Sequence, residues 1–127
     1  MDPYTYNAVI CSVYDGDTIH ANIDLGFGIQ QGTENSVPGA LLRLRGCNAR
    51  ELSEEGGHEA GEHLREILPA GTTVVLRTVK PDKFGGRYDA IVELPAGEDL
   101  VTRLISENWV AAWDGVGPRP IPPWPRP

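Results

Sequence analysis

Two early runs in which apolar and polar residues alternate constrain the fold of this chain more than any other feature. The clearer run spans residues 18–25, where four residues are predicted to face a core: Ile19, Ala21, Ile23 and Leu25. The looser run spans residues 7–13, where three residues are predicted to share the buried side: Val9, Cys11 and Val13. Alternation with a period of two is typical of strands that bury one face. Asp15-Gly16 between the runs is a hairpin-type turn signal, so the chain is predicted to begin with two strands.

Three more strands and two helices are predicted further along the chain. The polar stretch at residues 26–39 is expected to be a loop, and the strands that follow it are predicted over Leu41–Cys47, Thr72–Val79 and Tyr88–Leu94. Apolar residues at helical spacing predict a helix with Ser53 as its N-cap and Pro69 just beyond its end, and a second helical stripe follows residue 97. This order predicts a mainly β fold with helices (α+β): a five-stranded OB-type barrel with two to three helices.

Length and proline content predict one domain followed by a tail. The chain has 127 residues, of which 40% are hydrophobic, and this is enough for a single core. Six of the eleven prolines lie between Pro118 and Pro127, where the chain is expected to be extended and outside any sheet interior. We therefore expect a domain over residues 1–115 and a Pro-rich tail over residues 116–127. The tail is interpreted as a surface extension, and a Pro-rich ligand for a partner protein is the alternative.

The N-terminus and the cysteines bear on the expected compartment. The first seven residues contain neither a basic segment nor an apolar one, so no secretory signal is predicted and a cytoplasmic location is expected. No stretch approaches the ~20 apolar residues of a membrane span, so no membrane association is expected. Cys11 and Cys47 are accordingly predicted to be free, buried thiols.

The distribution of charge matters more than its sum. A net charge of -7 argues against long-range attraction to nucleic acid. Seven of the eleven basic residues nevertheless lie in two short windows, residues 43–50 and 77–87. The sequence therefore predicts a local basic cleft on an acidic body.

Three short segments contain the residues that hydrolysis of a phosphodiester would need. The segment Asp15–Thr18 offers two carboxylates to a hard cation. Arg43 and Glu51 lie eight residues apart in the second segment, and Lys83–Arg87 ends on a further arginine. A guanidinium can pair with two phosphate oxygens at once, and a carboxylate can orient a water or take a proton from it.

Each segment taken alone has an ordinary structural explanation. An isolated Asp-Gly-Asp is usually a turn with solvated carboxylates. Arg43 fits the exposed face of a strand, Glu51 fits the start of a helix, and Arg87 fits a solvated strand edge. These explanations are the stronger ones for any single segment, but they do not explain why the segments occur together.

In order and spacing, the segments resemble those of the staphylococcal nuclease (thermonuclease) family. The resemblance runs from about Val9 to Gly115 and includes the order of strands and helices. Asp15–Thr18 is similar to the family's first metal-binding turn, and residues 43–51 are similar to its arginine strand and metal loop. Residues 82–87 are similar to its third motif. The resemblance implies an OB barrel with a calcium ion at its rim.

The resemblance also implies roles for individual residues. Three are implied to be catalytic: Arg43, Glu51 and Arg87. Four are implied to bind the calcium ion: Asp17, Asn48, the backbone carbonyl of Ala49, and Glu51. Two are implied to lie near the bound nucleotide: Lys83 and Phe84. Among the tryptophans, Trp113 is predicted to lie at the rim, where a base could stack on it; Trp109 is expected in the core, and Trp124 in packing of the tail.

The chain departs from the family pattern at three places. Asn48 stands where the family usually has Asp, so one ligand would be uncharged and calcium affinity should fall. Arg50 stands where the family usually has Pro, which is expected to loosen the loop that aims Glu51. One extra glycine lies between Lys83 and Arg87, and it shifts Lys83 and Phe84 relative to the pattern.

The resemblance leads us to expect a calcium-dependent nuclease that acts as a monomer. It would hydrolyse DNA and RNA, preferably single-stranded or locally open, with little sequence specificity, leaving 3′-phosphate ends. Two alternatives stay open: a binding module that holds nucleic acid or a peptide without cutting it, and an interaction protein that works through its tail. The joint presence of Arg43, Glu51 and Arg87 favours the nuclease, whereas Asn48 and the acidic net charge favour a binding module.

Overall fold

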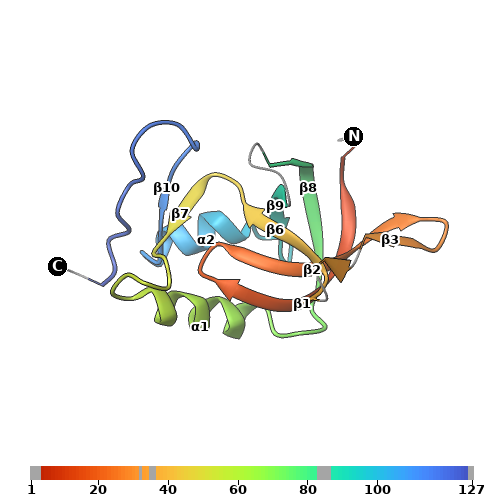
Figure 1. The fold of residues 1–127 in the computed structure, drawn as a ribbon, viewed down its shortest axis with the longest axis horizontal. Helices are drawn as coiled ribbons and strands as arrows, with labels where there is room; N and C mark the ends of the chain where they lie inside the picture. Colours follow the sequence, from red (N-terminus) through yellow and green to blue (C-terminus); the bar gives the residue numbers. More distant parts are fainter. Residues whose placement is uncertain (1–3, 32, 35–36, 83–86, 126–127) are drawn as a thin grey trace.

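The secondary structure is mainly β (Figure 1). The computed structural model describes residues 4–31, 33–34, 37–82 and 87–125. The strands are β1 (Tyr6–Asp15), β2 (Thr18–Gly26), β3 (Ile29–Gln31), β4 (Thr33–Glu34), β5 (Val37–Pro38), β6 (Ala40–Leu44), β7 (Cys47–Ala49), β8 (Thr73–Pro81), β9 (Tyr88–Glu93) and β10 (Val110–Ala112). The helices are α1 (Gly57–Ile67) and α2 (Leu100–Ser106). Neither helix of the described ranges is long and apolar enough to cross a membrane.

Five strands close into a barrel because β1 pairs with two neighbours. The hydrogen-bonded order is β1-β8-β9-β6-β2, and β2 pairs with β1 again. Within the barrel β6 and β9 run parallel, and the other neighbouring strands run antiparallel. This topology confirms the predicted OB-like α+β fold. A closed barrel of this kind leaves loops at its ends from which a site can be built.

The alternating residues of the strands form the barrel core. Ile19 of β2 and Leu42 and Leu44 of β6 are almost completely buried. Leu64 of α1 and Leu104 of α2 are buried in the same cluster. Burying an aliphatic side chain of this size stabilises the fold by roughly 1.5–3 kcal/mol, so the alternation seen in the sequence contributes directly to stability.

The first half of β1 buries the opposite face from the one predicted. Ala8 and Ile10 are buried, whereas Val9 is 42% exposed. The pairing of β1 with β2 shifts its register between Ile10 and Ser12, as at a β-bulge, and beyond this shift Val13 is buried. An extra residue reverses the alternation, which explains why Val13 was predicted correctly and Val9 was not. Cys11 lies at the bulge and is only half-buried, although it is free, as is the buried Cys47.

The end of β2 leaves the barrel. Leu25 is 45% exposed, which corrects the prediction that it faces the core. Here β2 pairs with β3, and Figure 1 shows this hairpin projecting from the side of the barrel. The predicted loop over residues 26–39 therefore contains short strands, β3, β4 and β5.

The helix α1 begins later than its predicted N-cap. The N-cap is Gly56 with a φ of 84°, not Ser53, and the helix ends at Ile67, just before Pro69 as predicted. Gly57 lies so close to the backbone of Glu51 that a Cβ atom there would collide with the Glu51 carbonyl. The Glu54 amide donates to the same carbonyl at 2.9 Å. Two adjacent glycines thus allow the segment that carries Glu51 to pack against the start of α1.

The Pro-rich tail folds back beside β7 and the start of α1. In Figure 1 the chain passes from β10 beside β7 and ends near the start of α1. Arg50 holds this segment by donating to the backbone carbonyls of Pro122, Trp124 and Pro125. The Trp124 ring contacts Trp109 with centroids 4.1 Å apart, and Trp109 is half-buried against the core, close to its expected position.

Candidate active site

An open cavity of about 880 Å³ lies at the end of the barrel where the β1–β2 turn, β6, β7 and the segment before β9 meet. Six residues predicted for the site line it: Asp17, Arg43, Ala49, Glu51, Arg87 and Trp113. Asn48 is buried beside it, whereas the predicted nucleotide contacts Lys83 and Phe84 lie outside the described residues. The lining also includes charged residues outside the predicted site, among them Asp89, Asp114 and Arg119.

Asp17 ties three elements together at the floor of the cavity. Asp17 is only 7% exposed. Its carboxylate accepts hydrogen bonds from the Ala49 amide at 3.0 Å and from the Thr18 hydroxyl at 3.1 Å. Its backbone carbonyl accepts from the Leu44 amide at 2.9 Å. The β1–β2 turn is therefore fixed against the ends of both β6 and β7.

The glycine of this turn permits the close packing. A Cβ atom at Gly16 would lie 2.8 Å from the Cβ of Ala49 and 2.9 Å from that of Ala60. The turn can therefore approach β7 and α1 only without a side chain at this position.

Burial, followed by the adjacent Asp17 carboxylate, raises the pKa of Asp15 to about 6. Two carboxylates are thus held close together, which disfavours their joint ionisation unless a cation is nearby.

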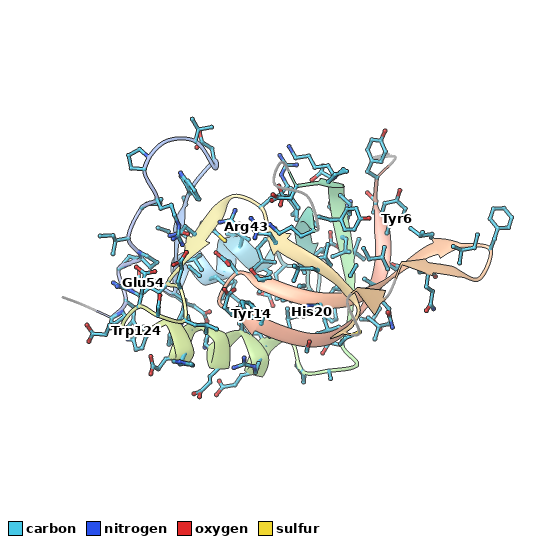
Figure 2. The ribbon with its side chains drawn as sticks, in the orientation of Figure 1. Tyr6, Tyr14, His20, Arg43, Glu54 and Trp124 are labelled. Atoms are coloured by element: carbon cyan, nitrogen blue, oxygen red, sulfur yellow. The ribbon has the colours of Figure 1, made fainter. Side chains whose placement is uncertain are left out.

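Arg43 faces the cavity because its neighbours on β6, Leu42 and Leu44, face the core (Figure 2). Its Nη2 lies 3.7 Å from Asp17 Oδ2, and its guanidinium carbon lies 5.6 Å from the centre of the Trp113 ring. An arginine held between a carboxylate and an aromatic face has a restricted orientation. The Arg43 side chain is therefore held in a defined orientation in the cavity.

Arg87 reaches the same cavity from the segment that precedes β9. Its Nε lies 3.2 Å from Asp82 Oδ2. The parallel pairing of β6 with β9 places Asp89 opposite Arg43. Burial, and then the neighbouring Asp82 carboxyl, raise the pKa of Asp89 to about 6. Two arginines, one on β6 and one just before β9, thus line the cavity beside acidic partners.

Glu51 and Asn48 share a partner from the tail, Arg119. The Asn48 Oδ1 accepts from Arg119 Nε at 2.9 Å and from Nη2 at 2.6 Å. Arg119 Nη1 donates to Glu51 Oε1 at 2.6 Å, and Nη2 reaches the Ala49 carbonyl oxygen at 3.4 Å. Three of the four predicted calcium ligands therefore surround one guanidinium.

Sequence reasoning missed Arg119 because nothing local marks it. A lone arginine among prolines belongs to no motif, and its bond to Asn48 joins positions 71 residues apart. The one available signal was Asn48 itself, whose side-chain amide also donates to the Pro120 carbonyl at 2.9 Å. An Asp at this position would have no N–H to offer, so the amide suits a residue that both accepts from the tail and donates to it.

The predicted ligands suit a hard cation in their chemical type, because all four offer oxygen atoms. Over the described ranges, no group of three or more His, Cys, Asp or Glu side chains is arranged to hold a metal ion, so amide and carbonyl oxygens would have to complete a site. Cys47 would not contribute a thiolate, because burial raises its pKa to about 12. The same oxygens already hold a guanidinium, which indicates that this position favours positive charge.

The sequence matches no family in a comparison with known protein families, and no curated protein is significantly similar to it.

Proposed function

We propose that this chain is a metal-dependent nuclease of the staphylococcal nuclease type, which hydrolyses DNA and RNA with little sequence specificity. One observation carries the proposal. Arg43, Glu51 and Arg87 come from three segments of the chain and line one cavity together with Asp17. A fold without phosphodiester chemistry has no need to bring these four residues into one cavity.

The two arginines would bind and polarise the phosphate. Negative charge builds on the phosphoryl oxygens during attack by water, and fixed guanidiniums stabilise it without reorganising. Arg43 is oriented by Asp17 and by the Trp113 ring, and Arg87 by Asp82. These contacts hold both guanidiniums at the cavity wall and leave their remaining donors for substrate oxygens.

Glu51 would serve the attacking water. Its side chain is 56% exposed and lines the open cavity, so water can reach it. A carboxylate there can orient the water or accept its proton. A calcium ion, held by Asp17, Asn48, the Ala49 carbonyl and Glu51, would neutralise charge on the phosphate when bound.

The surroundings favour flexible nucleic acid over duplex. The net charge of -7 opposes binding along a rigid helix, whereas a single strand can bend toward the arginines of a cavity that also carries acidic side chains. Trp113 lines the cavity, and its ring would offer a surface on which a base could stack. We therefore propose single-stranded or locally open DNA and RNA as substrates.

The test is cleavage of denatured DNA by the purified protein, with millimolar calcium and with a chelator. Glu51→Gln and Arg87→Ala are each expected to lower kcat by roughly 10²–10³-fold, because each removes a group that acts on the transition state. Arg103→Ala, a change of equal charge on α2, is the control and should cut normally. Cutting that persists in the chelator, or that is unaffected by both variants, would refute the proposal.

A nucleic-acid-binding module without catalytic activity is the second candidate. The observation that favours it is the ion pair between Arg119 and Glu51, which occupies the residue proposed to serve water. In that case the protein would retain denatured DNA in a filter-binding assay and leave it uncut at every calcium concentration.

A further inference from the structure

The tail is held beside the cavity by specific contacts. Besides the three carbonyls that Arg50 holds, the Trp124 amide donates to the Asn108 carbonyl at 3.1 Å. Trp124 contacts the ring of Trp109, which in turn stacks on His63 at 4.6 Å. Figure 2 shows Trp124 near the start of α1, where it lies against Gly56. The segment that carries Arg119 is therefore fixed on its C-terminal side, at residues 122–125.

The Arg119 guanidinium donates hydrogen bonds to oxygens that are predicted calcium ligands. Asn48 Oδ1 accepts two of its N–H groups, and one oxygen of Glu51 accepts a third. A divalent cation needs the same lone pairs within direct ligand distance. It would also meet the repulsion of a positive charge already in place. Guanidinium and cation therefore cannot share Asn48 Oδ1, and they compete for Glu51.

We propose that the Pro-rich tail is an internal competitor for the cation site, with Arg119 as the residue that excludes a divalent cation. This inference rests on the proposed function, since it concerns the metal that the same site would use. Calcium binds only when Arg119 withdraws, so the tail lowers the apparent affinity by the fraction of molecules in which the site is open. Glu51 is released in the same movement and becomes available to water.

The first experiment measures calcium binding by isothermal titration calorimetry, without any nucleic acid. Arg119→Ala is expected to bind calcium about tenfold more tightly than the unaltered protein, because it removes charge-assisted hydrogen bonds that calcium must otherwise break. Arg77→Ala is the matched control: Arg77 also pairs with a glutamate at 2.6 Å, but with Glu93. It does not line the cavity, and its calcium affinity should equal that of the unaltered protein.

A second variant guards against misfolding of the first. Arg50→Ala leaves Arg119 and its acceptors intact and removes three contacts that hold the tail. It is expected to tighten calcium binding in the same direction by a smaller factor. Circular dichroism of each variant checks that the barrel is retained.

The outcomes separate this inference from the proposed nuclease. Equal or weaker calcium binding in folded Arg119→Ala and Arg50→Ala would overturn the competitor role, even if the unaltered protein cuts DNA with calcium. Tighter binding in Arg119→Ala would support it, even if no variant cuts DNA. Absence of calcium binding in every folded variant would also overturn it, because the freed oxygens would then have no affinity for the cation.

Discussion

At the scale of single residues, the cavity holds carboxylates close to one another and close to arginines. Asp89 lies opposite Arg43 across the β6–β9 pairing and shares its wall with Asp82, which pairs with Arg87. Burial and the neighbouring carboxyl make the charged form of Asp89 unfavourable, so its pKa rises to about 6. The residue therefore couples the stability of the fold to pH.

The replacement Asp89→Asn tests this coupling. The folded-state pKa of about 6 exceeds the ordinary value of 3.8, so the folded protein retains a proton that the unfolded chain releases, and stability falls as pH rises between those values. Asn carries no such proton, so the variant should be more stable above pH ~6.5 by on the order of 1 kcal/mol, allowing for solvent screening. Urea unfolding at about pH 4 and about pH 7.5 measures the difference. An equal stability difference at both pH values would contradict the prediction.

At the scale of elements, two glycines of α1 have opposite roles. Gly57 faces the Glu51 carbonyl without room for a Cβ atom, whereas a Cβ at Gly61 would make only ordinary contacts of 3.5 Å or more. The first glycine sets how closely the Glu51 segment packs on the helix. The second is a weak point in helix propensity.

Alanine at each glycine should therefore change stability in opposite directions. Gly57→Ala is expected to lower the free energy of unfolding by about 1–3 kcal/mol, because the backbone must move to relieve the clash. Gly61→Ala is expected to raise it by about 0.5–1 kcal/mol, because alanine favours the helix. Chemical denaturation of both variants provides the comparison. A neutral Gly57→Ala would show that the loop can move at little cost.

At the scale of the whole molecule, the tail belongs to the structure that surrounds the cavity. It contacts Asn48 of β7, Arg50 just after this strand, and the start of α1, where Trp124 packs against Gly56. The boundary predicted at residue 115 reflects a change in composition. The segment beyond it nevertheless contributes Arg119 to the lining of the cavity.

The replacement Trp124→Ala measures how firmly the tail is attached. It removes the ring that contacts Trp109, and we expect unfolding to become easier by roughly 1–2 kcal/mol. Ile121→Ala, at a tail residue that is 76% exposed, is the control and should change stability by no more than about 0.5 kcal/mol. Thermal unfolding followed by circular dichroism suits both. Equal effects of the two changes would mean that the Trp124 ring does not anchor the tail.

Local patterns in the sequence predicted the strands of the barrel, because the period of two in β2 and β6 is a property that each strand shows independently. It also indicated the cavity residues Asp17, Arg43 and Arg87 through their spacing within short segments. The bulge at Ile10–Ser12 escaped it, since an extra residue in β1 has meaning only against the register of β2.

Only tertiary packing brings the Arg119 guanidinium of the tail to the cavity. Arg119 meets Asn48 across 71 residues of chain, and that meeting depends on the closure of the barrel, the β7–β10 ladder and the contacts of Arg50 with the tail. No local pattern encodes a contact of this kind, because its free energy arises only after the separate elements have packed. The positive group that these oxygens hold is therefore a property of the folded chain, since Arg119 and its acceptors come together only there.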